Sequence, residues 1–143
     1  MYSVKCILDE KGYGCTTITP ETSVHDALRK LTGKDIGALI VMKDEKVIGV
    51  FSERDYVRKS VLKGNIADDT PIKELMTEAM FTVDPHTRVI ECMELMTDRR
   101  VRHLPVLEKD KLVGIVSIGD VVKWVIRDQK NHIERLEDYI AGG

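Results

Sequence analysis

Hydrophobic and polar positions along the chain predict two amphipathic helices with the same spacing of apolar residues. After Thr22, and again after Thr87, apolar side chains recur three and four positions apart, which places them on one face of a helix. Threonine is a favoured N-cap residue, so Thr22 and Thr87 are the predicted N-caps. The two matching faces consist of Val24, Ala27, Leu28 and Leu31 in the first helix and Val89, Cys92, Met93 and Met96 in the second.

Each predicted helix lies between short extended segments. One extended piece precedes it before a proline, at residues 16–19 in one case and 80–83 in the other. Two β-branched runs joined by a polar turn follow it, as in a hairpin. A further helix is predicted to begin at Ser52 or Ser117, so each unit reads β-α-β-β-α. The hairpin strands are expected at 38–42 with 47–51, and at 104–107 with 112–116.

The two units are copies of one repeat. A shift of 65 positions aligns residues 17–59 with residues 82–124 without a gap, and 12 of the 43 pairs are identical. Eleven of the other 31 pairs place an apolar residue opposite an apolar residue. The duplication predicts an α/β fold in which helices cover the apolar face of small sheets.

The repeats divide the chain into five predicted segments. A short helix is expected at residues 71–76, between the repeats. The segments are an N-terminal piece at 1–15, the first repeat at 16–60, a linker at 61–79, the second repeat at 80–126, and a C-terminal helix at 127–143.

Composition and charge exclude several classes of function. The 22 basic and 24 acidic residues leave a net charge of −2, which argues against a protein that mainly binds nucleic acid. Apolar stretches are far shorter than the roughly 20 residues that span a bilayer, and the N-terminus has no signal-peptide pattern. Three cysteines without a C-x-x-C pair suggest neither a disulfide framework nor a zinc site. We expect a reduced, cytoplasmic setting with no membrane or nucleic-acid partner.

A Gly-h-h-Ser-x-x-Asp motif, in which h is apolar, ends the hairpin of each repeat. The motif runs from a strand into a helix start, where backbone N–H groups lack helical partners and favour an anion. Ser52 or Ser117 can add a hydroxyl group, and Asp55 or Asp120 can accept both vicinal hydroxyl groups of a ribose. The alternative is purely structural, because a serine N-cap with an acid three positions later stabilises a helix start.

These features resemble a tandem pair of cystathionine-β-synthase (CBS) domains, often called a Bateman module. The resemblance covers residues 15–126 and rests on the duplicated unit, the two motifs and the Arg-His-Leu-Pro-Val strand at 102–106. Segments 52–59 and 96–106 are similar to stand-alone bacterial CBS-pair proteins and to the plant CBSX group. The resemblance implies two repeats packed as a pseudo-twofold pair, with clefts between them for AMP, ADP, ATP, NAD or S-adenosylmethionine. It also implies a non-enzymatic sensor with no required cofactor, acting on an unidentified partner.

The resemblance further implies which residues contact the ligand. Arg102 and His103 lead into the central strand of the second repeat, where basic groups can meet phosphates, although a surface or structural role is the alternative. Gly119 leaves room for a phosphate beside Asp120. Glu53 and Arg54 fill the equivalent position of the first repeat, where Arg54 can contact phosphate or Glu53 can repel it. The Asp120 cleft is therefore predicted to be the tighter site. Contacts to adenine are expected from Ile36, Gly37, Val101, Thr17 and Thr82, of which the two threonines could equally be structural.

Two other functions remain open from the residues. One is a nucleotide hydrolase that uses Asp55 or Asp120, and the other is an interaction module whose clefts stay empty. The four histidines show no H-x-x-x-H or H-E-x-x-H spacing, so no metal site is predicted.

The C-terminal residues carry a seam of apolar positions with alternating steps of four and three. This spacing is typical of a coiled coil, and we expect it to join two copies in a homodimer. The alternative is an amphipathic helix that folds back on its own domain. The seam consists of Val122, Ile126, Gln129, Ile133, Leu136 and Ile140.

Overall fold

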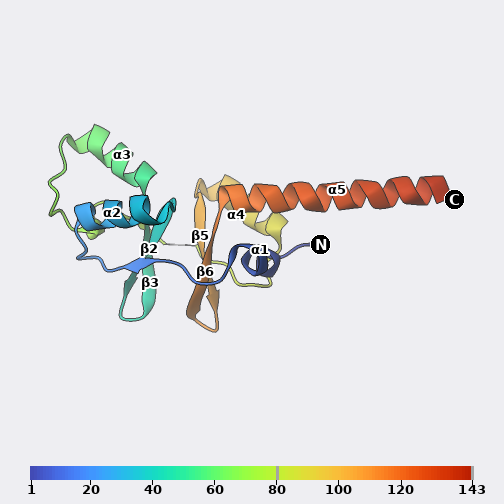
Figure 1. Ribbon diagram of the computed structural model, residues 1–143, viewed down its shortest axis with the longest axis horizontal. Helices are drawn as coiled ribbons and strands as arrows, with labels where there is room; N and C mark the ends of the chain where they lie inside the picture. Colours follow the sequence, from blue (N-terminus) through green and yellow to red (C-terminus); the bar gives the residue numbers. More distant parts are fainter. Residues whose placement is uncertain (80, 143) are drawn as a thin grey trace.

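The computed structural model describes residues 1–79 and 81–142, and it forms two small α/β units beside one long helix (Figure 1). The first unit contains β1 (Thr17–Ile18), α2 (Val24–Lys34), β2 (Ala38–Lys43), β3 (Lys46–Ser52) and α3 (Glu53–Lys63). The second contains α4 (Val89–Arg99), β5 (His103–Glu108), β6 (Lys111–Ser117) and α5 (Ile118–Gly142). Preceding and connecting them are α1 (Val4–Lys11), the 3-10 turn η1 (Ile72–Glu74) and β4 (Thr77–Glu78). The predicted α/β class is confirmed.

The first repeat is a four-stranded sheet in the order β1-β2-β3-β4, with β1 parallel to β2 and the other pairs antiparallel. The predicted apolar face of α2 packs on it, with Val24, Ala27 and Leu31 buried and Leu28 partly buried. Ile72 and Leu75 from the segment between the repeats complete this core. The helix predicted at 71–76 is therefore a single 3-10 turn.

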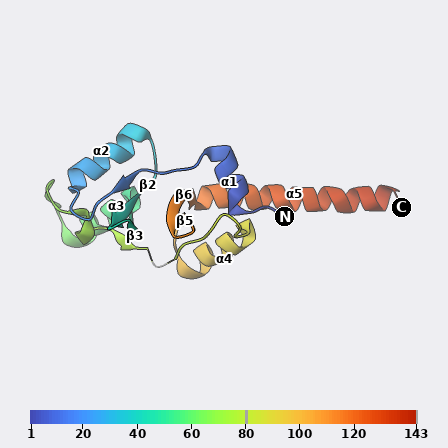
Figure 2. The same cartoon turned by 90° about the horizontal axis from the view of Figure 1, so that it is seen from below.

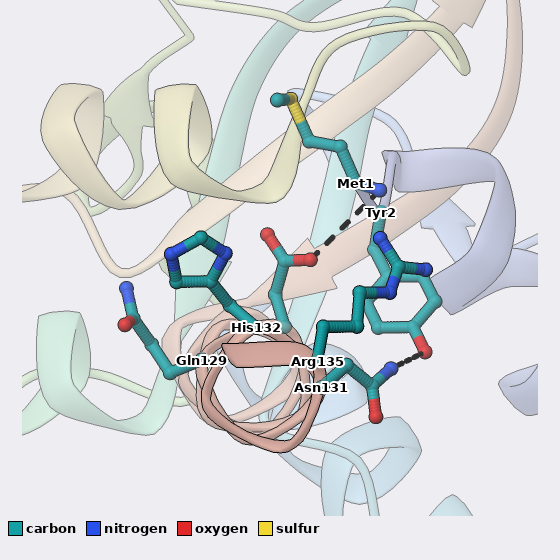
Figure 3. Close-up of a pocket in the computed structure, with 7 residues that line it drawn as sticks. Met1, Tyr2, Gln129, Asn131, His132 and Arg135 are labelled. Carbon is teal, nitrogen blue, oxygen red and sulfur yellow. Dashed lines mark hydrogen bonds and ion pairs between the residues drawn. The ribbon is translucent and has the colours of Figure 1, made fainter. Parts of the chain in front are cut away.

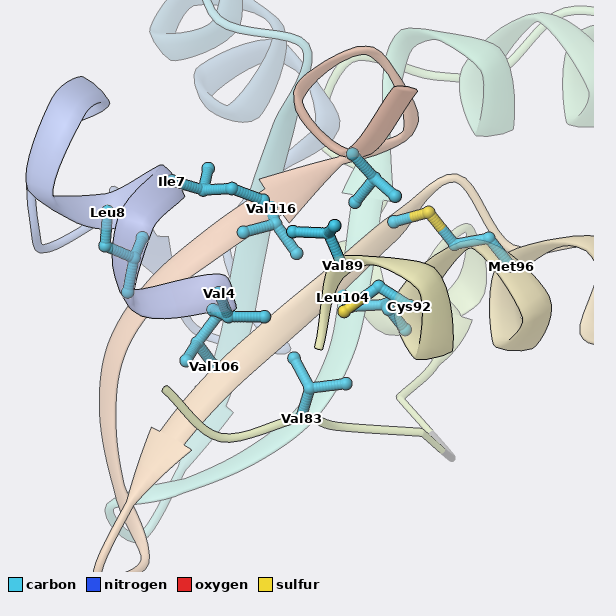
Figure 4. Packing of buried hydrophobic residues seen from close by; sticks show 11 residues of the cluster. Val4, Ile7, Leu8, Val83, Val89, Cys92, Met96, Leu104, Val106 and Val116 are labelled. Atoms are coloured by element: carbon cyan, nitrogen blue, oxygen red, sulfur yellow. The ribbon is translucent and has the colours of Figure 1, made fainter. Parts of the chain in front are cut away.

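The second repeat pairs β5 with β6, and its first strand is reduced to one bridge between Val83 and Val106. The extended piece predicted at 80–83 is thus only this bridge among the described residues, and Met80 lies outside them. Buried side chains from α4, both strands and α5 form the core (Figure 4). Met93, from the predicted face, is partly buried.

Helix α1 completes the core of the second repeat rather than standing apart from it. Val4, Ile7 and Leu8 are buried against that core (Figure 4). The contact explains Gly114 on β6, because a Cβ atom there would lie 2.8 Å from Cδ2 of Leu8. A larger residue would require the buried Leu8 side chain to move, so glycine favours this close approach of the helix to the strand.

The helix starts differ from the prediction by one residue. Ser23 is the N-cap of α2 and accepts a hydrogen bond from the backbone N–H of Asp26 at 3.1 Å, and Arg88 precedes α4. The hydroxyl group of Thr22 instead accepts from the Thr19 N–H at 3.1 Å, and that of Thr87 does the same for its preceding turn. Both threonines therefore stabilise turns before the helices.

Helix α5 runs without a break from the motif of the second repeat through the predicted C-terminal helix. Two perpendicular views show it extending well beyond the body of the molecule (Figures 1 and 2). Its seam residues Ile126, Ile133 and Leu136 are about half exposed, at 50%, 51% and 49%. Over the described residues, none of the helices is both long enough and apolar enough to cross a membrane.

Candidate ligand-binding cleft

A cleft of about 500 Å³ lies between the two repeats. Its walls come from the start of α3 in the first repeat, from residues 77–79 and Phe81 of the connecting segment, and from residues 99–105 of the second repeat. The volume falls within the range of pockets that hold small molecules. The motif of one repeat therefore faces the segment leading into the central strand of the other.

Ser52 and Asp55 form a reciprocal capping box at the start of α3. The Ser52 hydroxyl group accepts from the Asp55 N–H at 3.2 Å, and Oδ2 of Asp55 accepts from the Ser52 N–H at 2.9 Å. Asp120 and Ser117 repeat the arrangement at the start of α5, at 3.1 Å and 2.9 Å. The structural role that the residues left open is thus present in both motifs.

The capping box also fixes the Asp55 carboxylate at the edge of the cleft. Its Oδ1 accepts a hydrogen bond from the hydroxyl group of Thr77 on β4, at 2.9 Å. Ser52, Asp55 and Thr77 all line the cleft. A carboxylate held in one orientation, with a neutral and exchangeable hydroxyl partner, can accept hydroxyl groups of a ligand in place of Thr77.

Five arginines converge on the cleft. Arg54 and Arg58 lie one turn apart on α3, whereas Arg99, Arg100 and Arg102 come from the end of α4 and the loop after it. Within residues 1–79 and 81–142, none of these guanidinium groups has a carboxylate within 4.0 Å. With Asp55 and Glu78 as the acidic lining residues and His103 neutral, the lining charge is 5 − 2 = +3.

His103 is a half-buried titratable group in the cleft. Burial lowers the pKa of its imidazole, and the Asp55 carboxylate offsets only part of that effect. A Cβ atom on Gly37 would lie 3.5 Å from Nε2 of His103, so the first repeat approaches the ring closely. A buried neutral imidazole next to several arginines can gain a proton when an anion binds.

Apolar groups line the cleft beside the arginines. Val50, Phe81 and Val101 contribute side chains, and the guanidinium group of Arg99 lies 5.1 Å above the centre of the Phe81 ring. The cation–π contact orients Arg99 towards the connecting segment. The cleft thus combines an apolar surface, an oriented carboxylate and a basic wall.

The Asp120 motif has a different environment, because a lysine from α1 binds its carboxylate. Nζ of Lys11 lies 2.7 Å from Oδ2 of Asp120 and also donates to the carbonyl oxygen of Ile115 at 3.1 Å. Burial raises the pKa of Asp120, but the hydrogen bonds from Lys11 and from the Ser117 backbone outweigh it and hold the pKa below its usual value. The Asp120 carboxylate is therefore ionised, and the ammonium group of Lys11 balances its charge.

The structure brings together seven of the predicted site residues. Arg102 and His103 lie beside the second motif, as predicted, because the Ile118 N–H donates to the Arg102 carbonyl oxygen and His103 pairs with Ser117. They also line the Asp55 cleft, because each repeat presents its motif to the strands of the other. Ile36 is packed against the core of the first repeat. Thr17, in β1, pairs with Ile40 of β2. The lining of this cleft includes Ser52, Arg54, Asp55, Gly37, Val101, Arg102 and His103, but not Ser117, Gly119, Asp120, Thr17, Thr82 or Ile36.

Several lining residues were not predicted from the sequence. Arg100 corresponds to Asp35 under the shift of 65 positions, so a comparison of the repeats by charge could have identified it. Arg99 corresponds to Lys34, which has the same charge, and gave no such signal. Arg58 follows Arg54 by four positions and could have been placed on the same helix face. Thr77 carried no such signal, because its role depends on β4 pairing with β3.

A smaller pocket of about 270 Å³ lies where the N-terminus meets α5 (Figure 3). The N-terminal ammonium group of Met1 lies 3.9 Å from the Asp128 carboxylate, and the side-chain amide of Asn131 donates to the hydroxyl group of Tyr2. The Tyr2 ring also packs edge-on against Trp124. These contacts attach the start of the chain to α5.

Comparison with known proteins gives a consistent result. The CBS domain family model matches residues 13–61 and 72–127. The CBS domain-containing protein CBSX3, mitochondrial, of Arabidopsis thaliana is 40% identical over 134 residues, covering 90% of this chain and 64% of that protein. A crystal structure of the CBS domain protein NE2398 is 48% identical with a TM-score of 0.79, covering 87% of this chain and 97% of that one. The structure of CBSX2 in complex with AMP is 26% identical with a TM-score of 0.67, covering 90% and 99%.

Three of the curated relatives are longer than this chain. It spans 64% of the plant protein, 35% of a protein from Thermofilum pendens and 53% of one from Methanopyrus kandleri.

Proposed function

The chain belongs to the CBS domain family, whose members are regulatory modules, and from that premise we propose that it binds an adenine nucleotide in the Asp55 cleft. The observation that carries the proposal is the oriented Asp55 carboxylate facing a basic wall across about 500 Å³. The CBSX2 complex with AMP supports the ligand class by similarity. CBSX3 is named as mitochondrial, and a cytoplasmic location for this chain remains a prediction.

Each part of the cleft has a role in this proposal. Asp55 accepts the ribose hydroxyl groups, with Ser52 holding it in place. The arginines and His103 meet the phosphates, because guanidinium groups bind phosphate oxygens in pairs. Val101 and the backbone at Gly37 contact the base. Ser117, Gly119, Asp120, Thr17, Thr82 and Ile36 remain predictions for a second ligand at the other motif.

We propose a regulatory role rather than catalysis. A ligand that touches both walls of the cleft links the two repeats, so its binding energy depends on how they pack. A partner protein can then respond to that packing. The alternative is nucleotide hydrolysis by Asp55 or Asp120, which would require a bound metal or a base placed against the attacking water. Product chromatography after incubation with ATP or NAD tests this alternative directly.

We also propose that α5 joins two copies of the chain. Its seam residues Ile126, Ile133, Leu136 and Ile140 are exposed and lie on one face of a helix that extends beyond the body. A second copy would bury this face by the same contacts from both sides.

Thermal unfolding with and without millimolar adenosine, AMP, ATP or NAD tests the function. A ligand at 100 times its dissociation constant should stabilise the fold by about 2.7 kcal/mol. Native mass spectrometry of freshly purified protein then identifies any retained nucleotide. Unfolding curves unmoved by all of these ligands contradict the proposal.

A further inference from the structure

We infer that the Asp55 cleft selects nucleotides carrying two or more phosphates over AMP and over cationic adenosine derivatives. This inference rests on the proposed nucleotide binding and specifies the ligand class. It follows from the five arginines, which have no carboxylate partner within 4.0 Å among the described residues.

The number of cations is the first argument. Guanidinium groups stay charged at all accessible pH values, so five of them around one cleft repel each other until an anion binds. A single phosphate monoester carries about −1.5 to −2 charges near neutral pH. The lining charge of +3 exceeds this, and a di- or triphosphate compensates it more fully.

The placement of the arginines is the second argument. Arg54 and Arg58 lie on α3 of the first repeat, and Arg99, Arg100 and Arg102 come from the end of α4 and the loop after it in the second. A phosphate chain is long enough to meet donors from both walls, whereas a single phosphate beside the ribose reaches fewer of them. The Asp55 carboxylate fixes the ribose near α3, so the chain must extend from there along the basic wall.

The same charge disfavours S-adenosylmethionine. Its sulfonium and ammonium groups outweigh its single carboxylate, so the ligand brings a net positive charge to a cleft that already has a surplus of +3. A cationic site of this kind discriminates by repulsion of cations as well as by attraction of anions.

Calorimetric titration of the full chain with adenosine, AMP, ADP, ATP, S-adenosylmethionine and inorganic tripolyphosphate tests the inference. We expect affinity to rise at least tenfold from AMP to ATP, and a steeper salt dependence for ATP. The double substitution Arg54→Gln/Arg58→Gln should weaken ATP binding at least tenfold and adenosine binding little. Both side chains are exposed, so the fold is preserved. Arg29→Gln, an exposed arginine on α2 outside the cleft, is the matched control.

Each outcome decides between the two proposals. Equal affinities for AMP and ATP, or ATP binding unchanged by the double substitution, overturn the selectivity while nucleotide binding stands. Tripolyphosphate binding that depends on Arg54 and Arg58, with no preference for an adenosine moiety, overturns the nucleotide function and keeps the polyphosphate site. If none of the six compounds binds, both proposals are overturned.

Discussion

The ammonium group of Lys11 lies 2.7 Å from Oδ2 of Asp120 and connects helix α1 to the motif of the second repeat. In the first repeat, the hydroxyl group of Thr77 makes the corresponding contact with Asp55. The shift of 65 positions that relates the repeats places Lys11 opposite Met76. Two motifs with the same sequence pattern therefore have carboxylates with different partners, a lysine ammonium group for Asp120 and a neutral hydroxyl group for Asp55.

Replacing Lys11 with the residue of the other repeat tests the contact. In the wild type, the side chains of Lys11 and Asp120 are 37% and 25% exposed, so solvent screening limits the stability that Lys11→Met loses. We expect the free energy of unfolding to fall by about 0.5–1 kcal/mol, measured by urea denaturation. Lys5→Met is the control, because Lys5 pairs with Asp9 on the exposed face of the same helix. An equal loss in both variants would show that the Asp120 contact has no special role.

The pH dependence of the same contact has a defined sign. Although burial alone raises the pKa of Asp120, hydrogen bonds from Lys11 and Ser117 lower it below the unfolded value of about 3.9. The stabilisation is therefore present above about pH 4 and is lost as pH falls through the lower folded pKa. We expect the wild type and Lys11→Met to differ in unfolding free energy at pH 6 and to converge below pH 4. A constant difference across that range would contradict this assignment.

Much of the fold follows from local sequence patterns. The remainder depends on contacts between segments that are distant in the sequence. The apolar spacing of Val24, Ala27 and Leu31 identifies the buried face of α2, because helical periodicity is local. Nothing local indicates that α1 covers Gly114 through Leu8, more than 100 positions away. The packing of α1 had to be found in three dimensions.

The candidate site divides in the same way. The capping boxes of Ser52–Asp55 and Ser117–Asp120 are readable from residue spacing. The position of Arg102 and His103 in the same cleft as Asp55 is not, because it depends on how one repeat packs against the other. The sequence alone does not indicate which aspartate motif shares a cleft with the basic residues of the second repeat.

Proton uptake on ligand binding is expected at His103. Burial lowers its pKa, with the Asp55 carboxylate acting in the opposite direction, so the imidazole is mostly neutral near pH 7. A bound phosphate favours the protonated ring, and binding should take up protons between pH 6 and 7. Calorimetry of ATP binding in buffers of different ionisation enthalpy measures the number of protons.

The contribution of His103 is the proton uptake of the wild type minus that of a variant without the imidazole. This difference also removes the protons that the ligand itself takes up or releases. His103→Gln should take up fewer protons than the wild type, and His25→Gln, an exposed histidine on α2, should match the wild type. Equal proton uptake in all three proteins would show that His103 does not face the phosphates.

Assembly through α5 is tested by charge on its exposed face. Ile133→Glu/Leu136→Glu places two carboxylates on side chains that are half exposed, so the monomer should stay folded. We expect the wild type to scatter light as a particle of twice the monomer mass and the variant to approach the monomer mass. Glu134→Gln on the same helix is the control. A dimer that persists in the variant would place the interface elsewhere.

Asp55 and Asp120 offer a matched pair for identifying the principal site. Each forms the same capping box, so Asp55→Ala and Asp120→Ala lose the same backbone contact at a helix start. Only Asp55 lines the cleft with the arginines, whereas Asp120 is paired with Lys11. This arrangement reverses the order expected when Arg102 and His103 were assigned to the Asp120 motif.

Loss of two charge-assisted hydrogen bonds, each worth about 1.5–3 kcal/mol and partly replaced by water, should reduce ATP affinity roughly tenfold to a thousandfold in Asp55→Ala. Asp120→Ala should change it less than about threefold, because Lys11 already occupies that carboxylate. Calorimetric titration of both variants measures the difference, and a large loss confined to Asp120→Ala would assign the tight site to the second motif.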